Sequence, residues 1–130
     1  MESAYEFLKE CGVFYLATVE DDQPRVRPFG AVCVFEDKLY IITNNQKDVY
    51  KQIQTNSKVE ISGMAKGKWI RLAAEAVRDD RVEARKAMLD ANPSLRSMYK
   101  EDDGLMEVLI LQNAKGAICS FTEAPIPFAF

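Results

Sequence analysis

The residues best suited to binding chemistry lie in two short segments of this 130-residue chain, residues 24–30 and 40–47. In the first segment, Arg25 and Arg27 are two positions apart, so in a strand both guanidinium groups point to the same side. Pro28 follows directly and has no N–H to donate to a sheet. This favours an edge strand or a bulge and leaves neighbouring backbone groups free to meet a ligand. A solvated outer strand face is the plainer interpretation of the same residues.

The second segment combines features typical of a phosphate site. An apolar strand ends at Thr43, and Asn44 adds a short polar side chain before a helix predicted over residues 46–55. A helix N-terminus offers free backbone N–H groups, and Lys47 and Lys51, four positions apart, add cations to one helix face. A capped helix with solvated lysines is the alternative. Together the two segments suggest a nucleotide-like cofactor, with a phosphate at the second and a flat ring against the first.

A third candidate is the pair Trp69 and Arg71, which share one face of a predicted strand while Ile70 and Leu72 fill the other. The only tryptophan of the chain, beside a guanidinium, can stack on an aromatic ligand or on a partner subunit. A tryptophan that partly covers an apolar surface is the alternative.

The C-terminal residues 123–130 are also unusual. Two prolines favour an extended path, and Phe128 and Phe130 are costly to leave in water. We therefore expect the tail to pack, either on a neighbouring subunit or on its own barrel.

Composition narrows the function classes. The chain has no histidine, which removes a Ser-His-Asp triad, a Cys-His dyad and histidine ligation of metal or haem, and no acidic pair suits acid–base work. No catalytic or metal-ligating residue is therefore predicted. Three cysteines without a Cys-x-x-Cys pair are expected to be reduced and mostly buried. A net charge of -3, no long apolar run and no signal-peptide pattern predict a cytoplasmic protein that binds neither nucleic acid nor membrane.

The elements that must position these residues are short strands joined by hairpin turns, with helices between them. Strands are predicted at residues 13–19, 25–35, 39–43, 58–64 and 68–78, with one or two closing strands in 105–112 and 117–121. Helices are predicted at residues 2–11, at 46–55 with Asn45 as N-cap, and at 80–91, with a helical turn at 95–99. The sum is one mainly β domain with helices, residues 1–130, in which about six antiparallel strands form a small barrel with the helices outside.

In order and spacing these segments resemble the FMN-binding split-barrel family, whose best-known member is pyridoxamine 5'-phosphate oxidase. The resemblance covers roughly residues 12–80 and is carried by segments 14–19, 23–30, 39–44, 47–53, 58–61 and 69–72. Leu-Ala-Thr-Val at 16–19 followed by Arg-Pro-Phe at 27–29 is most similar to the branch that includes the nitroimidazole-resistance proteins. The resemblance implies a six-stranded antiparallel split β-barrel that binds FMN as a homodimer, with two cofactor sites at the subunit interface.

Carried over by position, the resemblance implies a set of cofactor-binding residues from both subunits. These are Arg27, Pro28 and Phe29 along the flavin ring and ribityl chain, Thr43, Asn44 and Lys47 at the phosphate with Lys51 on the same helix face, and Trp69 and Arg71 from the other subunit. Two departures limit the transfer. The histidine associated with nitroimidazole-resistance proteins is missing, and so is the Trp- and Arg-bearing C-terminal segment that helps the oxidase bind pyridoxamine phosphate. Neither nitroimidazole reduction nor vitamin B6 oxidation is therefore predicted.

The leading hypothesis is an FMN-dependent oxidoreductase of unknown substrate, in which the protein supplies binding, orientation and electrostatics. One alternative is a flavin-binding sensor or carrier without turnover. Another is a related barrel that binds a deazaflavin or haem, although the missing histidine argues against histidine-ligated haem.

Overall fold

The computed structural model describes all residues 1–130, and its strands and helices follow the predicted order with different boundaries. The strands are β1 (Phe14–Glu20), β2 (Gln23–Phe29), β3 (Val32–Phe35), β4 (Lys38–Asn44), β5 (Lys58–Ala65), β6 (Lys68–Asp79), β7 (Met106–Cys119) and β8 (Ile126–Ala129). The helices are α1 (Glu2–Cys11), α2 (Asp48–Thr55) and α3 (Val82–Ala91), followed by the 3-10 helix η1 (Pro93–Ser97).

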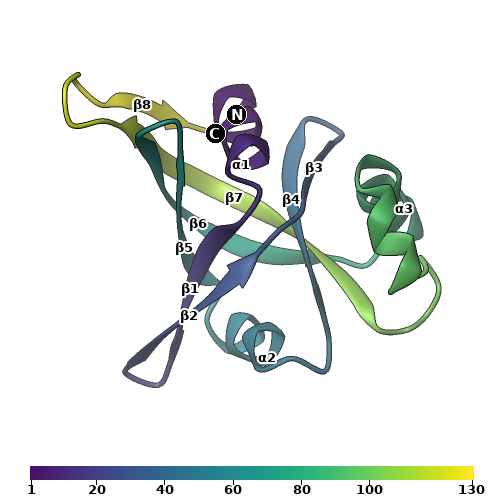
Figure 1. Cartoon of the computed structure of the whole chain (residues 1–130). Helices are drawn as coiled ribbons and strands as arrows, with labels where there is room; N and C mark the ends of the chain where they lie inside the picture. Colours follow the sequence, from purple (N-terminus) through teal and green to yellow (C-terminus); the bar gives the residue numbers. More distant parts are fainter.

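All strand pairs are antiparallel and form one curled sheet in the order β2-β1-β5-β6-β7-β4-β3, with β8 paired to β7 (Figure 1). The end strands β2 and β3 do not pair with each other, so the barrel is split. The predicted mainly β fold with helices is confirmed. The expected number of six strands is wrong, because the sheet has eight.

Tight turns explain why the hairpins form where the sequence predicts them. Glu36 and Asp37 have φ of 52° and 59°, and Lys66 and Gly67 have φ of 52° and 75°. Positive φ at both central residues is the two-residue hairpin geometry whose twist matches that of the flanking strands. These local turns fix the β3–β4 and β5–β6 pairs.

The single strand predicted over residues 25–35 is wrong, because the chain makes two strands there. β2 pairs with β1, whereas β3 pairs with β4 as far as Val32 opposite Ile41. Gly30 and Ala31 belong to neither strand, so the chain crosses at this point from one open edge of the sheet to the other. The split in the barrel therefore lies directly after the segment that contains the two arginines.

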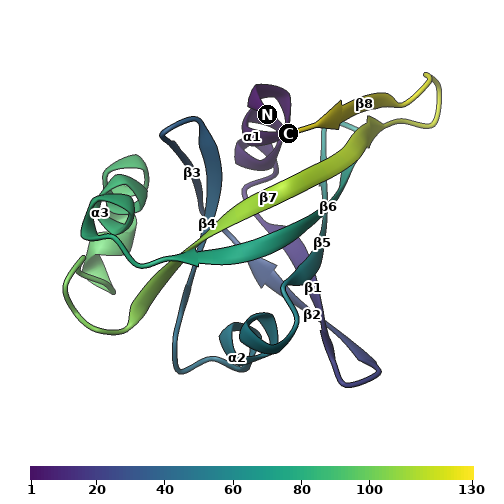
Figure 2. The same ribbon diagram turned by 180° about the vertical axis from the view of Figure 1, so that it is seen from behind.

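The closing segment is one long strand, β7, which runs across the whole molecule (Figure 2). It pairs with β6 along its length, with β4 in its first half and with β8 in its second half. Phe130 exchanges two 2.8 Å backbone hydrogen bonds with Ala114, and Phe128 and Phe130 pack against the core. Of the two places expected for the tail, the structure shows it on its own barrel.

Two cores hold the helices in place. The interior of the barrel is apolar, and α1 packs Phe7 and Leu8 into it while α2 packs Val49 and Ile53. In Figure 1, α1 and α2 lie at opposite ends of the barrel. A second core joins α3 to β3, β4 and β7 outside the barrel. None of the helices is long and apolar enough to cross a membrane.

The three cysteines are free thiols. Cys33 is buried in the second core, and burial raises its pKa to about 12, so it stays protonated at neutral pH. Cys11 and Cys119 are half-buried.

Candidate functional site

A cavity of about 320 Å³ lies where the barrel splits. Its walls come from the β2–β3 connection, the end of β4, the start of α2, and the segment from the end of α3 through η1. This volume is in the range of small-molecule sites. The lining residues are Arg27, Pro28, Phe29, Gly30, Ala31, Ile42, Thr43, Lys47, Val49, Asn92, Ser94, Leu95, Met98 and Tyr99.

Arg27 is a fixed cation in the strand wall of this cavity. Its Nη1 donates to Thr18 Oγ1 at 2.8 Å and to the Leu16 carbonyl at 3.2 Å, and its Nη2 donates to Gln52 Oε1 at 2.6 Å. Thr18 and Gln52 are themselves buried, and the Thr18 hydroxyl donates to Gln52 Oε1 at 2.6 Å. Burial lowers the pKa of Arg27, but a guanidinium stays charged at neutral pH. The guanidinium is therefore held in place before any ligand binds.

Arg25, in contrast, is not among the residues that line the cavity. It pairs with Glu20 at 2.9 Å on the exposed end of the β1–β2 hairpin. Of the two predicted arginines, only Arg27 lines the cavity, although both border the polar hollow beside it.

Thr43 at the end of β4 supplies an unsatisfied polar group to the same cavity. It is 3% exposed, and its hydroxyl has no hydrogen-bond partner in the protein. A buried polar group without a partner costs about 1–3 kcal/mol, so a ligand that bonds this hydroxyl gains affinity. Lys47 lines the same cavity and makes no ion pair. A free ammonium and a free hydroxyl on one wall suit an anionic group.

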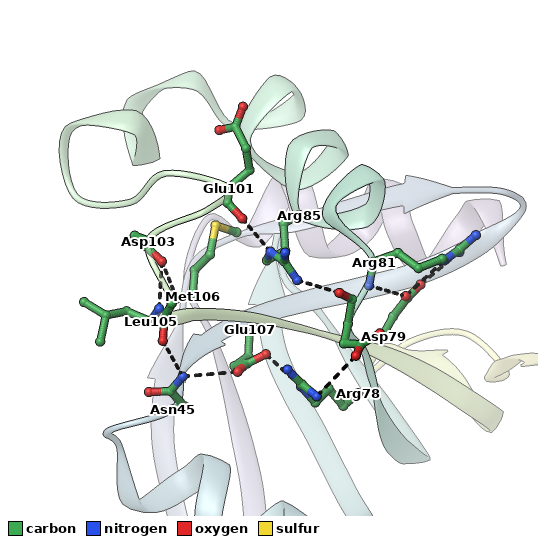
Figure 3. Close-up of polar contacts among 12 residues, drawn as sticks. Asn45, Arg78, Asp79, Arg81, Arg85, Glu101, Asp103, Leu105, Met106 and Glu107 are labelled. Carbon is green, nitrogen blue, oxygen red and sulfur yellow. Dashed lines mark hydrogen bonds and ion pairs between the residues drawn. The ribbon is translucent and has the colours of Figure 1, made fainter.

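The turn before α2 differs from its prediction. The helix begins at Asp48 with Lys47 as N-cap, so the predicted start at Gln46 and the capping role of Asn45 are wrong. The physical reason is that Asn45 turns toward β7 and bonds there (Figure 3). Asn44 Oδ1 instead accepts from the Gln46 backbone N–H at 3.0 Å, an Asx-type turn that shapes the entry to the helix.

The third wall of the cavity, from Asn92 to Tyr99, was missed by sequence reasoning. Asn44 Nδ2 donates to the Tyr99 hydroxyl at 3.2 Å, and Asn92 Nδ2 donates to the Val32 carbonyl at 3.0 Å. These two bonds join the α3–η1 segment to β4 and β3. The sequence predicted a helical turn at residues 95–99 but contained no signal that the turn folds over the site.

The structure thus brings five predicted site residues to one cavity, places a sixth beside it and leaves three elsewhere in the chain. Arg27, Pro28, Phe29, Thr43 and Lys47 line the cavity, and Asn44 borders it through Tyr99. Lys51 lies at a separate hollow on the other side of α2, Trp69 packs on Phe121 with ring centroids 4.9 Å apart, and Arg71 is exposed. The roles of all nine residues in cofactor binding stay predictions.

The open barrel and its cavity define the class of protein, a split β-barrel with a cavity at the split. The family model described as pyridoxamine 5'-phosphate oxidase matches residues 1–113, and the chain belongs to this family. No curated protein matches the chain.

Solved structures agree with this assignment. A NimC/NimA family protein from Clostridium acetobutylicum is 56% identical with a TM-score of 0.98, over 100% of this chain and 92% of that chain. General Stress Protein 26 from Bacillus anthracis is 16% identical with a TM-score of 0.76, over 99% and 97% of the two chains. A heme binding protein from Mycobacterium smegmatis is also 16% identical with a TM-score of 0.76, over 98% and 57%. The last two share the fold alone. The predicted resemblance, including its branch, is confirmed.

Proposed function

We propose that this protein binds FMN in the cavity at the barrel split and works as an FMN-dependent oxidoreductase. The observation that carries the proposal is one cavity that combines the fixed Arg27 guanidinium with the unpaired Thr43 hydroxyl and Lys47 ammonium. A ligand with a phosphate at one end and a polar ring at the other matches both walls. When bound, the flavin ring supplies the electron transfer that the side chains of this chain lack.

Each wall has a distinct task in this proposal. Thr43 and Lys47 hold the phosphate, and Pro28 and Phe29 lie along the ring. Arg27 places a fixed positive charge near the part of the ring that gains negative charge on reduction. We therefore expect Arg27→Ala to weaken FMN binding and to lower the reduction potential of the bound flavin, and unchanged values of both would remove Arg27 from the site.

The test of the phosphate wall compares FMN with riboflavin, which has no phosphate. Lys47→Ala is expected to weaken FMN by about ten-fold or more, because a charge-assisted bond contributes roughly 1.5–3 kcal/mol, and to leave riboflavin binding unchanged. Lys51→Ala is measured beside it, because Lys51 lies on α2 but outside the cavity, and unchanged FMN affinity there would remove Lys51 from the predicted phosphate site. Equal affinity of the wild type for FMN and riboflavin would refute the phosphate assignment.

Thr43→Val tests the hydroxyl without changing its volume much. Because that hydroxyl has no partner in the protein, the variant should be at least as stable as the wild type when ligand-free, yet bind FMN several-fold more weakly. A purely structural threonine would show the opposite pattern, with lower stability and unchanged affinity.

The proposal includes a homodimer that shares its sites between subunits. The outer face of β1, β5 and β6 exposes Tyr15 (52%) and Met64 (61%), and the strand register places Arg71 and Trp69 on the same face. An apolar face with a free guanidinium suits a second subunit better than water. We infer that Trp69 and Arg71 reach the flavin of the partner, so dilution should release FMN and subunits together.

Subunit mixing tests the shared site. Homodimers of Lys47→Ala and of Arg71→Ala each have both sites damaged, whereas their heterodimer has one doubly damaged site and one intact site. After proven exchange, about half of the sites in heterodimers should bind FMN at wild-type affinity and quench Trp69 fluorescence. Exchange without recovery would confine the site to one chain.

Turnover is tested separately from binding. A yellow protein whose flavin absorption is bleached by NADH or NADPH and recovered by an electron acceptor acts as an oxidoreductase. Flavin binding without bleaching would assign the alternative role of sensor or carrier.

A further inference from the structure

A buried carboxylate lies beside the cavity wall that contains Thr43 and Lys47. Glu107 on β7 has a side chain that is only 7% exposed. Its Oε1 accepts from Arg78 Nε at 2.9 Å, and its Oε2 accepts from Asn45 Nδ2 at 3.2 Å. We call Asn45, Arg78 and Glu107 the anchor network, and Figure 3 shows Glu107 between the other two.

The location of Glu107 needs a reason, because it lies next to a site proposed to bind an anion. In the β4–β7 pair it is directly opposite Thr43, and directly opposite side chains share a face with Cβ atoms roughly 5 Å apart. A buried carboxylate is costly unless it is paired and hydrogen-bonded. Arg78 pairs it, and the bond to Glu107 raises the pKa of Arg78. Arg78 thereby neutralises the charge of Glu107.

The second oxygen of Glu107 holds the turn that carries the anion site. Asn45 Nδ2 donates to Glu107 and also to the Gly104 carbonyl at 2.8 Å, and the Asn45 backbone N–H donates to the Leu105 carbonyl at 2.9 Å. These three bonds join the β4–α2 turn to the start of β7. Lys47 follows two residues later, so the position of its ammonium depends on where Asn45 is held.

We propose that Glu107 is a positioning residue that selects a phosphorylated flavin over an unphosphorylated one. It is not among the residues that line the cavity, and it acts by holding Asn45, and with it the turn that leads from Thr43 to Lys47. This inference rests on the proposed function of the cavity. It assigns to a buried ion pair a role in ligand discrimination, in addition to its role in the fold.

The experiment measures the dissociation constants of FMN and riboflavin for single and double variants. Asn45→Ala and Glu107→Ala should each reduce the FMN preference by about ten-fold, through weaker FMN binding with riboflavin binding unchanged. Because both act through one contact, the double variant should lose no more preference than either single variant.

Asp79→Ala is the matched control. Asp79 is a second buried carboxylate in an arginine pair, on the adjacent strand, and it makes no bond to the β4–α2 turn. It should lower stability but keep the FMN preference of the wild type. This control separates positioning from general destabilisation. General destabilisation would reduce the FMN affinity of Asn45→Ala, Glu107→Ala and Asp79→Ala alike.

The outcomes distinguish this inference from the proposed function. If the wild type does not prefer FMN, the phosphate assignment of the cavity fails. If the wild type prefers FMN and both anchor variants keep that preference within two-fold, the cavity assignment stands and the positioning role of Glu107 is wrong. Additive losses in the double variant would also overturn it. If circular dichroism shows that Glu107→Ala does not fold, Asn45→Ala decides alone, since Asn45 is in a turn and outside both apolar cores.

Discussion

The two ends of β6 differ in whether their charged side chains find partners within the chain. At the C-terminal end, Arg78 pairs with Glu107 and Asp79 pairs with Arg81 at 2.9 Å. At the N-terminal end, Trp69 and Arg71 face outward, and Arg71 makes no ion pair. One strand therefore joins a completed end, whose charges are paired within the chain, to an open end, where the Arg71 cation has no ion pair and Trp69 is only half-buried against Phe121.

The completed end shows why the difference matters. Asp79 accepts from Arg81 Nε at 3.1 Å, from Arg81 Nη2 and from the Tyr40 hydroxyl at 2.7 Å. The bonds from Arg81 and Tyr40 hold the pKa of Asp79 at about 2, and burial together with Asp79 raises the pKa of Tyr40 to about 12. These contacts join β4 and β6 to the start of α3, which leads into the third wall of the cavity.

Gly116→Ala should break the open end and gives the largest expected effect. A Cβ at Gly116 would lie 1.7 Å from the carbonyl oxygen of Arg71 and 3.0 Å from Leu72 Cα, so the backbone of β6 must move. We expect a loss of at least about 4 kcal/mol in the free energy of unfolding, measured by urea denaturation. Gly67→Ala is the control. Its φ is +75° with nothing near its Cβ, so it should cost only about 1 kcal/mol. Equal costs would show that β6 adapts freely at Arg71.

Asp79→Ala should disrupt the completed end and lower the free energy of unfolding by about 3 kcal/mol. The reason is that it leaves Tyr40 and Arg81 without their acceptor. Asp80→Ala is the matched neighbour. Asp80 is exposed and its 3.7 Å contact with Arg78 is a surface pair, so the loss should stay below about 0.5 kcal/mol. Similar losses for the two variants would mean that the completed end is no more tightly held than the surface.

Acid titration tests the contribution of Asp79 at the completed end separately. The pKa of Asp79 is about 2 in the fold against an ordinary value of 3.8, so the unfolded chain binds the proton first. The stabilisation that ionised Asp79 gives to the fold is present above about pH 4 and is lost as the pH falls through 2. This lowers the free energy of unfolding by about 2 kcal/mol. Asp90 and Asp103 also have lowered pKa values, so the readout is the difference between wild type and Asp79→Asn. Parallel pH profiles for the two proteins would contradict this assignment.

Arg71→Ala should have the smallest effect on folding, below about 0.5 kcal/mol, because an exposed arginine without an ion pair contributes little within one chain. If the open end meets the flavin of a partner, the same variant should weaken FMN binding by about ten-fold in the dimer. Calorimetric titration and thermal unfolding measure the two effects. A stable variant with unchanged FMN affinity would leave Arg71 as a surface residue.

The sequence by itself determined the local features of this protein. Hairpins formed at the predicted turns because residues such as Asp37 and Gly67 adopt positive φ within their own turn. The alternation of Ile70, Arg71 and Leu72 determined which face of β6 is buried. The family followed from the order and spacing of such segments.

Only the tertiary structure decided what surrounds the site. The chain divides at Gly30 because its two halves find partners on opposite edges of the sheet, and nothing in their apolar pattern marks the break. The sequence predicts a polar turn at Asn44 and a helix cap at Asn45. In the structure Asn44 bonds Tyr99, 55 residues away, and Asn45 bonds Glu107, 62 residues away. A competing contact from a distant strand outweighs a local cap when it satisfies a buried charge, and sequence periodicity carries no record of such contacts.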